Sequence, residues 1–328
     1  MEEPIVKVTD LKKWFPVKTG FWETIFSKKH LFVHAVDGIT FEIKTGEIFG
    51  LVGESGSGKT TTGRLLLRLI EPTAGTTHFK GNNLVNIPEK ELKLLRRKIQ
   101  IVFQDPYESL NPRMTIDAII SEPLRVQRLG DEASIHEKVR KVLEDVDLIP
   151  PEEFLFRYPH ELSGGQRQRV SVARAFVLDP EFIVADEPVS MLDVSIRAEV
   201  LDLMLNLVDK FHASILYITH DLALARHVCD RIAIMYLGKI MEVGPTEKIV
   251  YEPLHPYTKA LIRAVPIPDP TAERIKVVIS GEIPSPINVP TGCRFHTRCP
   301  VVMEICRQKE PQLVDVGKQH RVACHKYT

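Results

Sequence analysis

Gly53-Glu-Ser-Gly-Ser-Gly-Lys59-Thr60 is the stretch that decides the fold of this chain. It spells G-x-x-x-x-G-K-T, and it stands between an apolar run, Glu47-Ile-Phe-Gly-Leu-Val52, and a helical pattern from Lys59 to Ile70. Glycines at this spacing let backbone N–H groups turn toward phosphate oxygens, and the helix that follows adds its positive N-terminal end. The lysine reaches the β- and γ-phosphates, and the hydroxyl after it can ligate Mg²⁺. The pattern therefore predicts a strand, a phosphate loop and a helix that bind a nucleoside triphosphate.

Two carboxylates close a second apolar run, Phe182-Ile-Val-Ala-Asp186-Glu187. A run of this kind is typical of a buried parallel strand that delivers its last residues to the ligand-binding edge of a sheet. Phosphoryl transfer depends on positioning and charge neutralisation, so Asp186 is expected to hold Mg²⁺ through water and Glu187 to orient the attacking water. The plainer alternative is an ordinary strand with a surface acidic pair. The phosphate loop upstream favours the catalytic interpretation.

A third motif, Leu162-Ser163-Gly164-Gly165-Gln166, opens an amphipathic helical stretch. It makes a second helix N-terminus with backbone N–H groups suited to an anion. One nucleotide site does not need two such cradles, but two chains arranged head to tail would use both. A serine N-cap followed by glycines for a tight turn is the alternative, and without the other motifs it would be preferred.

The rest of the pattern indicates an α/β fold with a helical insertion. Strands are expected at 47–52, 99–103, 181–185, 214–219 and 231–236, and helices at 59–70 and 195–210. From about Pro106 to Glu161 the pattern is helical, at 115–128 and 134–147. Residues 17–33 form an apolar and basic insertion, for which packing on the sheet edge is favoured over contact with lipid headgroups.

Composition bounds the class of protein. The chain has 328 residues, of which 44% are hydrophobic and 26% charged, so one large domain or two modest ones can form an adequate core. The formal net charge of zero argues against a nucleic-acid partner. There is no apolar run of about 18 residues, and Met1-Glu-Glu-Pro does not resemble a signal peptide. We therefore expect a chain that does not cross a membrane itself.

The three motifs together resemble the Walker A, signature and Walker B motifs of the ATP-binding cassette (ABC) ATPases. Smaller marks agree: Gln104 resembles the Q-loop glutamine, and Ser190-Met-Leu-Asp193 resembles the D-loop, with Met191 where the family usually has a small residue. His220 follows the apolar run 215–219 and resembles the switch histidine. This assignment depends on the spacing of motifs that is typical of the family. The adenine-stacking aromatic is expected in Trp14-Phe15, with Phe15 preferred by its offset from Leu11.

The resemblance implies a P-loop NTPase fold, an ABC-type nucleotide-binding domain with a helical subdomain and a Pro-rich, Cys-containing C-terminal extension. Its catalytic residues would be Glu187, His220 and Gln104, and Mg²⁺ would be held through Thr60, Gln104 and Asp186. The implied ATP contacts are Phe15, Gly53, Glu54, Ser55, Gly56, Ser57, Gly58, Lys59, Thr60 and Thr61. The implied contacts to the partner's ATP are Ser163, Gly164, Gly165 and Gln166, with Asp193 in the D-loop.

The proline-dense tail carries a narrower resemblance. Leu254-His-Pro-Tyr-Thr-Lys-Ala-Leu261 and Gly292-Cys-Arg-Phe-His-Thr-Arg-Cys-Pro300 resemble the C-terminal region of the oligopeptide/dipeptide importer ATPases. Ser109-Leu-Asn-Pro112 and Asp186-Glu-Pro-Val-Ser190 are closer to the F type of subunit than to the D type. This implies an ABC ATPase domain over 1–250, with its helical subdomain at about 106–161, and an extension over 251–328.

The same resemblance implies partners and a location. We expect a D-type ATPase subunit as partner in a heterodimer (a homodimer is the alternative), two transmembrane permease subunits, and an extracytoplasmic binding protein reached indirectly. The chain would lie on the cytoplasmic face of the membrane as a peripheral subunit. Peptides are the expected cargo, with oligosaccharides or nickel as alternatives. A non-transport ABC ATPase in DNA repair or translation is disfavoured because there is no heptad run, second cassette or basic arm.

Four of the five cysteines fall in the tail as C-x5-C-x6-C-x17-C: Cys293, Cys299, Cys306 and Cys324. Clustered cysteines in a cytosolic protein are more often metal ligands than disulfides. The wide spacing favours a [4Fe–4S] cluster, as expected for several members of this importer group, over zinc and over free buried thiols. Cys229 stands apart and is expected to be a small core residue.

Overall fold

The computed structural model describes residues 3–17, 31–264 and 281–328. Contacts divide the chain into two compact units, each assembled from separate stretches of sequence. The first unit comprises residues 1–5, 44–47 and 86–218, and the second comprises residues 6–43, 48–85 and 219–328. Most of the insertion predicted at 17–33 lies outside the described residues.

The first unit contains a parallel sheet. Its strands are β6 (Ile99–Val102), β7 (Phe182–Asp186) and β8 (Ser214–Thr219), which confirms three predicted strands. They pair in the order β6-β7-β8. Every residue of β7 and β8 is buried, as expected for parallel strands that are covered on both faces and read as unbroken apolar runs. The shared strand direction brings the carboxyl ends, including Asp186, to one edge of the sheet.

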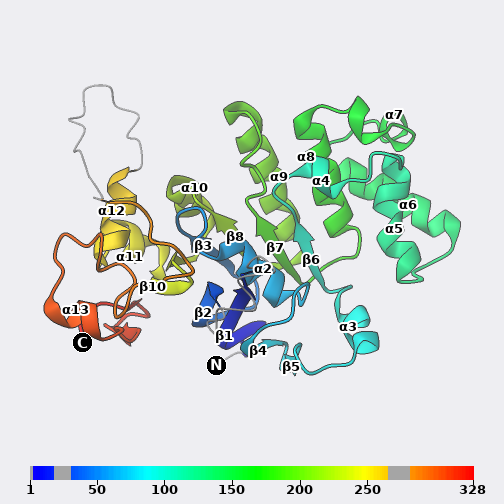
Figure 1. The fold of residues 1–328 in the computed structure, drawn as a ribbon. Coiled ribbons are helices and arrows are strands. Elements are labelled where there is room, and N and C mark those ends of the chain that lie inside the picture. The colour runs from blue at the N-terminus through cyan, green and yellow to red at the C-terminus, as the bar shows by residue number, and fades with distance from the viewer. Residues whose placement is uncertain (1–2, 18–30, 265–280) are drawn as a thin grey trace, which may run out of the picture. The chain divides into compact units, whose positions relative to one another are not determined.

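Helices make up the remainder of the first unit (Figure 1). They are α3 (Glu89–Leu95), α4 (Pro106–Ser109), α5 (Ile116–Val126), α6 (Glu132–Asp145), α7 (Glu152–Leu155), the 3₁₀ turn η1 (Pro159–Glu161), α8 (Gly164–Phe176) and α9 (Val194–Phe211). The helices predicted at 115–128, 134–147 and 195–210 are confirmed as α5, α6 and α9. Helix α6 begins two residues earlier than predicted because the Asp131 side chain accepts a hydrogen bond from Ser134 N and caps it.

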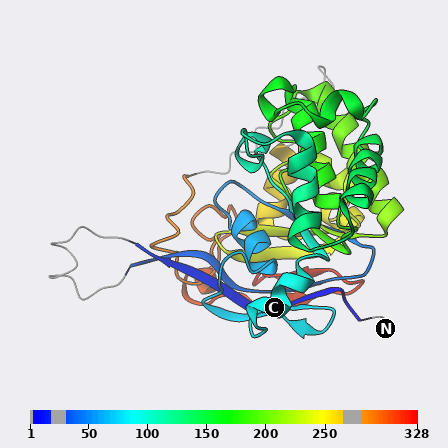
Figure 2. The same ribbon diagram turned by 90° about the vertical axis from the view of Figure 1, so that its right-hand side faces the viewer.

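The second unit contains an antiparallel sheet that the sequence analysis missed. Its strands are β1 (Val6–Pro16), β2 (Phe32–Ile43), β4 (Ala74–Phe79) and β5 (Asn82–Asn83), in the order β2-β1-β4-β5. The two longest, β1 and β2, run side by side (Figure 2). Their pairing shifts register between Val8 and Leu11 and again between Lys13 and Trp14. Such irregularities break the alternation of apolar and polar residues on which a strand prediction depends.

Further strands of the second unit are β3 (Ile48–Val52), β9 (Arg231–Tyr236), β10 (Lys239–Pro245), β11 (Val314–Asp315) and β12 (Arg321–Val322). β3 and β9 are parallel, whereas β10 returns antiparallel to β9 and then pairs with β12. The helices are α2 (Lys59–Leu66), α10 (Leu222–Val228), α11 (Thr246–Tyr251), α12 (Pro256–Ala264) and α13 (Glu304–Gln308). Helix α2 ends at Leu66, before the predicted Ile70, and the chain then takes left-handed backbone at Arg68, with φ +46°, which a right-handed helix cannot contain.

A buried carboxylate fastens the tail of the second unit. Glu242 of β10 is fully buried and accepts hydrogen bonds from Leu254 N at 2.8 Å and His255 N at 2.9 Å. Its Oε1 also lies 2.7 Å from Nε2 of His320. The carboxylate of Glu242 thus connects β10 with the turn before α12 and with the distant His320. A buried carboxylate is stable only with such partners, so these contacts fix the turn that starts α12.

Aromatic rings give the proline-rich tail its core. Phe295 is buried and lies with its ring centroid 5.4 Å from that of Tyr236 and 5.3 Å from that of Tyr257. The two tyrosine rings are 4.8 Å apart. Ring pairs at these distances add to the stabilisation from apolar burial. A segment with few helices or strands of its own is therefore held by side-chain packing.

The free energy of unfolding is expected to decrease below neutral pH, because His255 takes up a proton more easily in the unfolded chain than in the folded one. Its Nδ1 accepts a hydrogen bond from Tyr257 N, and burial lowers the pKa of His255 to about 4, against a smaller opposing effect of Glu242. The unfolded chain takes up this proton near pH 6.5, so the contribution is complete above pH 6.5 and is lost as pH falls toward 4. The loss is about 2 kcal/mol at pH 5.

Thermal denaturation at pH 7.5 and pH 5 tests this expectation. His255→Asn keeps an acceptor for Tyr257 N but does not titrate, so its melting temperature should change less between the two pH values than that of the parent chain. His227→Asn, at an exposed position of α10, should keep the parental difference. An unchanged pH dependence in His255→Asn would contradict the assignment.

Candidate functional site

The phosphate loop runs between β3 and α2 in the second unit, as predicted. Two of its glycines are required by close backbone approach: a Cβ at Gly53 would lie 2.1 Å from Met235 O, and a Cβ at Gly58 would lie 2.1 Å from Ala35 O. Gly58 also has φ +107° and Gly56 has φ +77°, a region that side chains with a Cβ disfavour. The loop therefore presses against β2 and β9, which fixes the direction of its N–H groups.

The side chains of the loop fit an anion. Lys59 Nζ donates to Gly53 O at 2.8 Å and Glu54 O at 3.0 Å, so the ammonium is held within the loop. Ser57 Oγ is buried without a hydrogen-bond partner among the described residues. Thr60 and Thr61 lie in the first turn of α2, where N–H groups and the helix dipole favour negative charge. A buried hydroxyl without a partner is costly, and a phosphate oxygen would satisfy it.

Two residues of the tail hold this loop, and the sequence analysis gave neither a role. Tyr257 OH accepts a hydrogen bond from Glu54 N at 3.0 Å. Arg298 Nη1 donates to Glu54 Oε2 at 2.8 Å, and Nη2 donates to Oε1 at 3.3 Å. The two-point contact restrains the Glu54 side chain, and burial of Arg298 limits screening by water. Both residues lie within the quoted tail motifs, but their type and spacing give no sign of phosphate binding.

In the first unit, the structure brings two predicted catalytic residues together. Asp186 is buried at the end of β7, and Glu187 follows with φ +47°, an uncommon value for a residue other than glycine. Hydrogen bonds from Glu187 N to Ile218 O at 2.9 Å and from Ser190 N to Glu187 O at 3.1 Å hold this backbone. Gln104 Nε2 donates to Glu187 Oε2 at 3.1 Å. The amide of Gln104 thus orients the carboxylate of Glu187.

The third motif begins α8, also in the first unit. Ser163 is the N-cap: its hydroxyl accepts from Gln166 N at 3.3 Å, and Gln166 Oε1 accepts from Ser163 N at 3.0 Å. The N-cap interpretation is therefore confirmed for Ser163. This capping interaction does not exclude anion binding, because the Ser163 hydroxyl acts only as an acceptor in it and its proton is not donated to Gln166. Gly165 allows close packing on α9, since a Cβ there would lie 2.7 Å from Ile196 Cγ2.

The predicted D-loop and switch residues both stand at helix starts. Asp193 is the N-cap residue of α9 without a side-chain capping bond, and it is exposed. His220 follows β8 directly and is exposed. The turn that carries His220 is fixed because Asp221 N donates to Thr219 Oγ1 at 2.9 Å and the Asp221 carboxylate caps α10. The roles predicted for Asp193 and His220 stay predictions.

The adenine-stacking candidates lie next to each other in β1, with side chains on opposite faces. Trp14 Nε1 donates to Asp37 Oδ1 at 3.0 Å, and its ring lies 4.5 Å from that of His34. Phe15 is 37% exposed, with Lys13 Nζ 5.0 Å from its ring centroid. The ring of Trp14 is more restrained by its neighbours than the ring of Phe15, which is consistent with a preference for Phe15. That preference stays a prediction.

The four tail cysteines lie in the second unit as free thiols, and Cys299 is the most exposed. Burial, with smaller contributions from the neighbouring thiols, raises the pKa of Cys293 to about 12 and also raises the pKa of Cys299 and Cys324. Metal ligands are thiolates, so binding a metal at these thiols would release protons. Among the described residues, which include all four, no group of three or more His, Cys, Asp or Glu side chains could hold a metal ion. The predicted [4Fe–4S] or zinc site is therefore not supported here. Cys229 is a buried residue against Gly50, as predicted.

Comparison with known proteins gives two family matches. The first is described as "ABC transporter" and covers residues 36–190, and the second is described as "Oligopeptide/dipeptide transporter, C-terminal region" and covers residues 241–306. The oligopeptide transport ATP-binding protein AppF of Bacillus subtilis is 48% identical and covers 100% of this chain and 98% of its own. The putative peptide import ATP-binding protein BOV_A0347 of Brucella ovis is 46% identical and covers 98% of each.

Solved structures give the same class. The ATP-binding cassette MJ0796, in a dimeric post-hydrolysis state bound to ADP and Pi, matches with a TM-score of 0.63 and 28% identity over 74% of this chain and 98% of its own. CbiO1 of Clostridium perfringens, part of an ABC transporter complex, matches with a TM-score of 0.64 and 26% identity over 76% of this chain and 92% of its own.

The fold and the three motifs therefore define a P-loop ATPase of the ATP-binding cassette class. Within that class, the chain belongs to the family of oligopeptide/dipeptide ABC transporter ATP-binding proteins. In the part of the chain that the structure describes, no helix has the length and apolar character needed to cross a membrane.

Tyr257→Phe is expected to weaken ATP binding about tenfold, because the partly buried Glu54 N–H of the phosphate loop loses its acceptor, and a lost hydrogen bond costs about 1 kcal/mol or more. Calorimetric titration with a non-hydrolysable ATP analogue measures the change. Tyr158→Phe removes the same atom from a residue of the first unit that forms no hydrogen bond with the described residues of the loop, and this variant should bind the analogue normally. Equal affinity in the two variants would show that Tyr257 does not support the loop.

Proposed function

We propose that this ABC ATPase powers the import of di- and oligopeptides, acting at the cytoplasmic face of a membrane with two permease subunits and, indirectly, an extracytoplasmic binding protein. The observation that carries the proposal is the match of the C-terminal region, residues 241–306, to the oligopeptide/dipeptide transporter family. Relatives similar over the whole chain, including AppF, are named as peptide transport proteins. Cargo selection itself is assigned to the permeases and the binding protein.

In the proposed reaction, the phosphate loop binds the ATP phosphates through its N–H groups, Ser57 and Lys59. Mg²⁺, held through Thr60, Gln104 and Asp186, would supply charge that neutralises the phosphate oxygens. The interactions of Lys59 with Gly53 O and Glu54 O support this role, because they keep the ammonium in the loop before nucleotide binds. Pre-positioned charge of this kind needs little reorganisation when the reaction occurs.

Glu187 is assigned to the attacking water, which it orients and polarises. The hydrogen bond from Gln104 to Glu187 Oε2 restrains the direction of the carboxylate that would accept from water. The left-handed backbone at Glu187 supports the assignment, since residues in uncommon conformations concentrate at functional sites. His220 is assigned to the γ-phosphate, and its fixed turn at the end of β8 is consistent with that role.

Dimerisation head to tail is the second part of the proposal, with Ser163, Gly164, Gly165 and Gln166 closing the nucleotide of the partner. Around Asp193, Met191 is 61% exposed and Val194 is 81% exposed. Apolar side chains gathered at the surface are typical of an interaction site. We propose a distinct ATPase subunit of the D type as the partner, and a homodimer is the alternative outcome.

The helical region is proposed to contact the permeases. Its exposed side chains include Phe156, which is 79% exposed, together with Tyr107 and Ile149. Tyr107 lies three residues after Gln104, so movement of this surface and movement of the Gln104–Glu187 pair are connected through a short segment of chain. This connection would pass nucleotide-driven motion to the membrane subunits.

Glu187→Gln is the variant that tests the function. In vesicles reconstituted with the permeases and the partner ATPase, it should reduce ATP turnover and peptide uptake by roughly a hundredfold or more, because the attacking water loses its base. ATP binding should remain, and size analysis with ATP should reveal a trapped dimer. Glu199→Gln, at an exposed position of α9, is the control with full activity. Near-normal turnover in Glu187→Gln would remove Glu187 from its role, and absence of peptide uptake by the parent chain would refute the importer.

The tail thiols carry a separate proposal, that Cys293, Cys299, Cys306 and Cys324 bind a [4Fe–4S] cluster, with zinc as the alternative. The donor chemistry supports it, since four soft ligands come from one short segment. Protein purified without oxygen should then contain about four irons and four sulfides per chain, which Cys293→Ser should abolish. One zinc per chain would select the alternative. A chain purified without metal would contradict both.

A further inference from the structure

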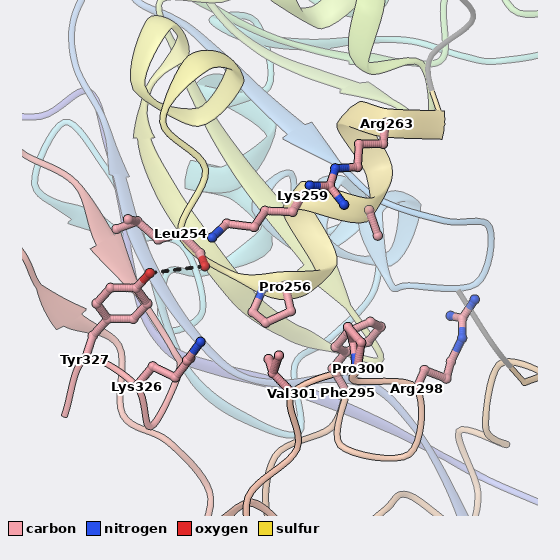
Figure 3. A pocket seen from close by; sticks show the side chains of 11 residues that line it. Leu254, Pro256, Lys259, Arg263, Phe295, Arg298, Pro300, Val301, Lys326 and Tyr327 are labelled. Atoms are coloured by element: carbon pink, nitrogen blue, oxygen red, sulfur yellow. Dashed lines mark hydrogen bonds between the residues drawn. The ribbon is translucent and has the colours of Figure 1, made fainter. Parts of the chain in front are cut away.

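A cavity of about 230 Å³ lies within the second unit between α12 and the cysteine-rich tail (Figure 3). Apolar side chains, including Phe295, Ala260 and Val301, form much of its lining. Phe295 and Ala260 are buried, whereas Val301 is 44% exposed, so the cavity has an apolar floor and opens at the surface. Neither the phosphate loop nor any residue assigned to catalysis lines it.

Positive charge surrounds this cavity. Lys259 and Arg263 extend into its lining from α12, and Lys326 comes from the C-terminal end of the chain (Figure 3). No aspartate or glutamate is among the described lining residues, and none of these three cations has an ion-pair partner among the residues that the structure describes. Three cations around one opening, with no acidic partner among the described residues, favour an anion.

The fourth cation of the lining behaves differently. Arg298 is occupied by the carboxylate of Glu54 in the phosphate loop. Helix α12 also touches that loop, since Tyr257 OH accepts from Glu54 N. The cavity therefore shares α12 and Arg298 with the phosphate loop, whereas Lys259, Arg263 and Lys326 form no hydrogen bond or ion pair with the described residues of that loop.

We propose that this cavity binds a phosphate monoester that carries a short apolar group. Two or three ammonium and guanidinium groups match the double charge of such a phosphate, with charge-assisted hydrogen bonds. The floor formed by Phe295 and Ala260 accepts the apolar group, as in ligand sites with apolar walls and few polar contacts. Both a soluble metabolite and the headgroup of an anionic phospholipid have this chemistry. The proposal does not depend on the importer function.

Calorimetric titration of the full chain with butyl phosphate, in the presence of saturating ADP and Mg²⁺, tests the site. Vesicles of neutral phospholipid with and without phosphatidic acid form a second arm. Lys259→Gln/Lys326→Gln should weaken binding about tenfold or more, because two charge-assisted hydrogen bonds are lost. Lys7→Gln/Lys90→Gln, two exposed lysines elsewhere, makes the same change in net charge and should bind as the parent chain does.

Two further variants keep the test decisive. Val301→Trp fills the cavity from an exposed position and should also abolish binding. Lys59→Ala weakens the phosphate loop and should leave binding unchanged. Butyl phosphate binding with this pattern supports a soluble ligand, and binding only to vesicles with phosphatidic acid, with the same pattern, supports a lipid headgroup. The proposal is overturned if neither probe binds, if the two lysine double variants bind equally, or if only Lys59→Ala loses binding.

Discussion

The absence of a Cβ at Gly53 and Gly58 is the constraint on which the nucleotide site depends. The loop backbone lies so close to Met235 O and Ala35 O that any side chain at either glycine would collide with main chain. Main chain cannot yield as a flexible side chain can, so the loop is fixed relative to β2 and β9. A fixed loop keeps its N–H groups and Lys59 directed at the same place whether or not phosphate is present, which is the basis of electrostatic preorganisation.

The tail adds a second restraint on the same loop. Glu54 is held at its amide by Tyr257 and at its carboxylate by Arg298, and both partners belong to the region after residue 250. That region in turn depends on the buried charge of Glu242 and on the rings around Phe295. The C-terminal extension is therefore structurally part of the phosphate-binding unit and not only an appendage to it. This gives a physical reason why the tail motif accompanies the ATPase motifs in one chain.

In the first unit, the corresponding constraint is the backbone of Glu187. Its left-handed conformation is maintained by Ile218 O and Ser190 N, and Gln104 then orients its side chain. Gln104 lies just before the helical region, whose exposed apolar residues include Tyr107 and Phe156. A displacement of this segment would alter the hydrogen bond to Glu187. The carboxylate of Glu187 and the exposed apolar side chains of the helical region are thus connected through one hydrogen bond, from Gln104 to Glu187.

The sequence alone determined the phosphate loop, the buried strands β6 to β9 and the helices α5, α6 and α9, because these depend on local signals: glycine spacing, unbroken apolar runs and helical periodicity. It did not determine β1 and β2, whose pairing is interrupted by register shifts, or the end of α2, after which the backbone turns left-handed at Arg68. The sequence spacing of the four tail cysteines predicted a metal cluster, and the described residues do not support that prediction, because the spacing along the chain does not report how the thiols are arranged in space. The roles of Tyr257 and Arg298 were decided by tertiary structure only, because a contact that spans 203 or 244 residues leaves no trace in local sequence.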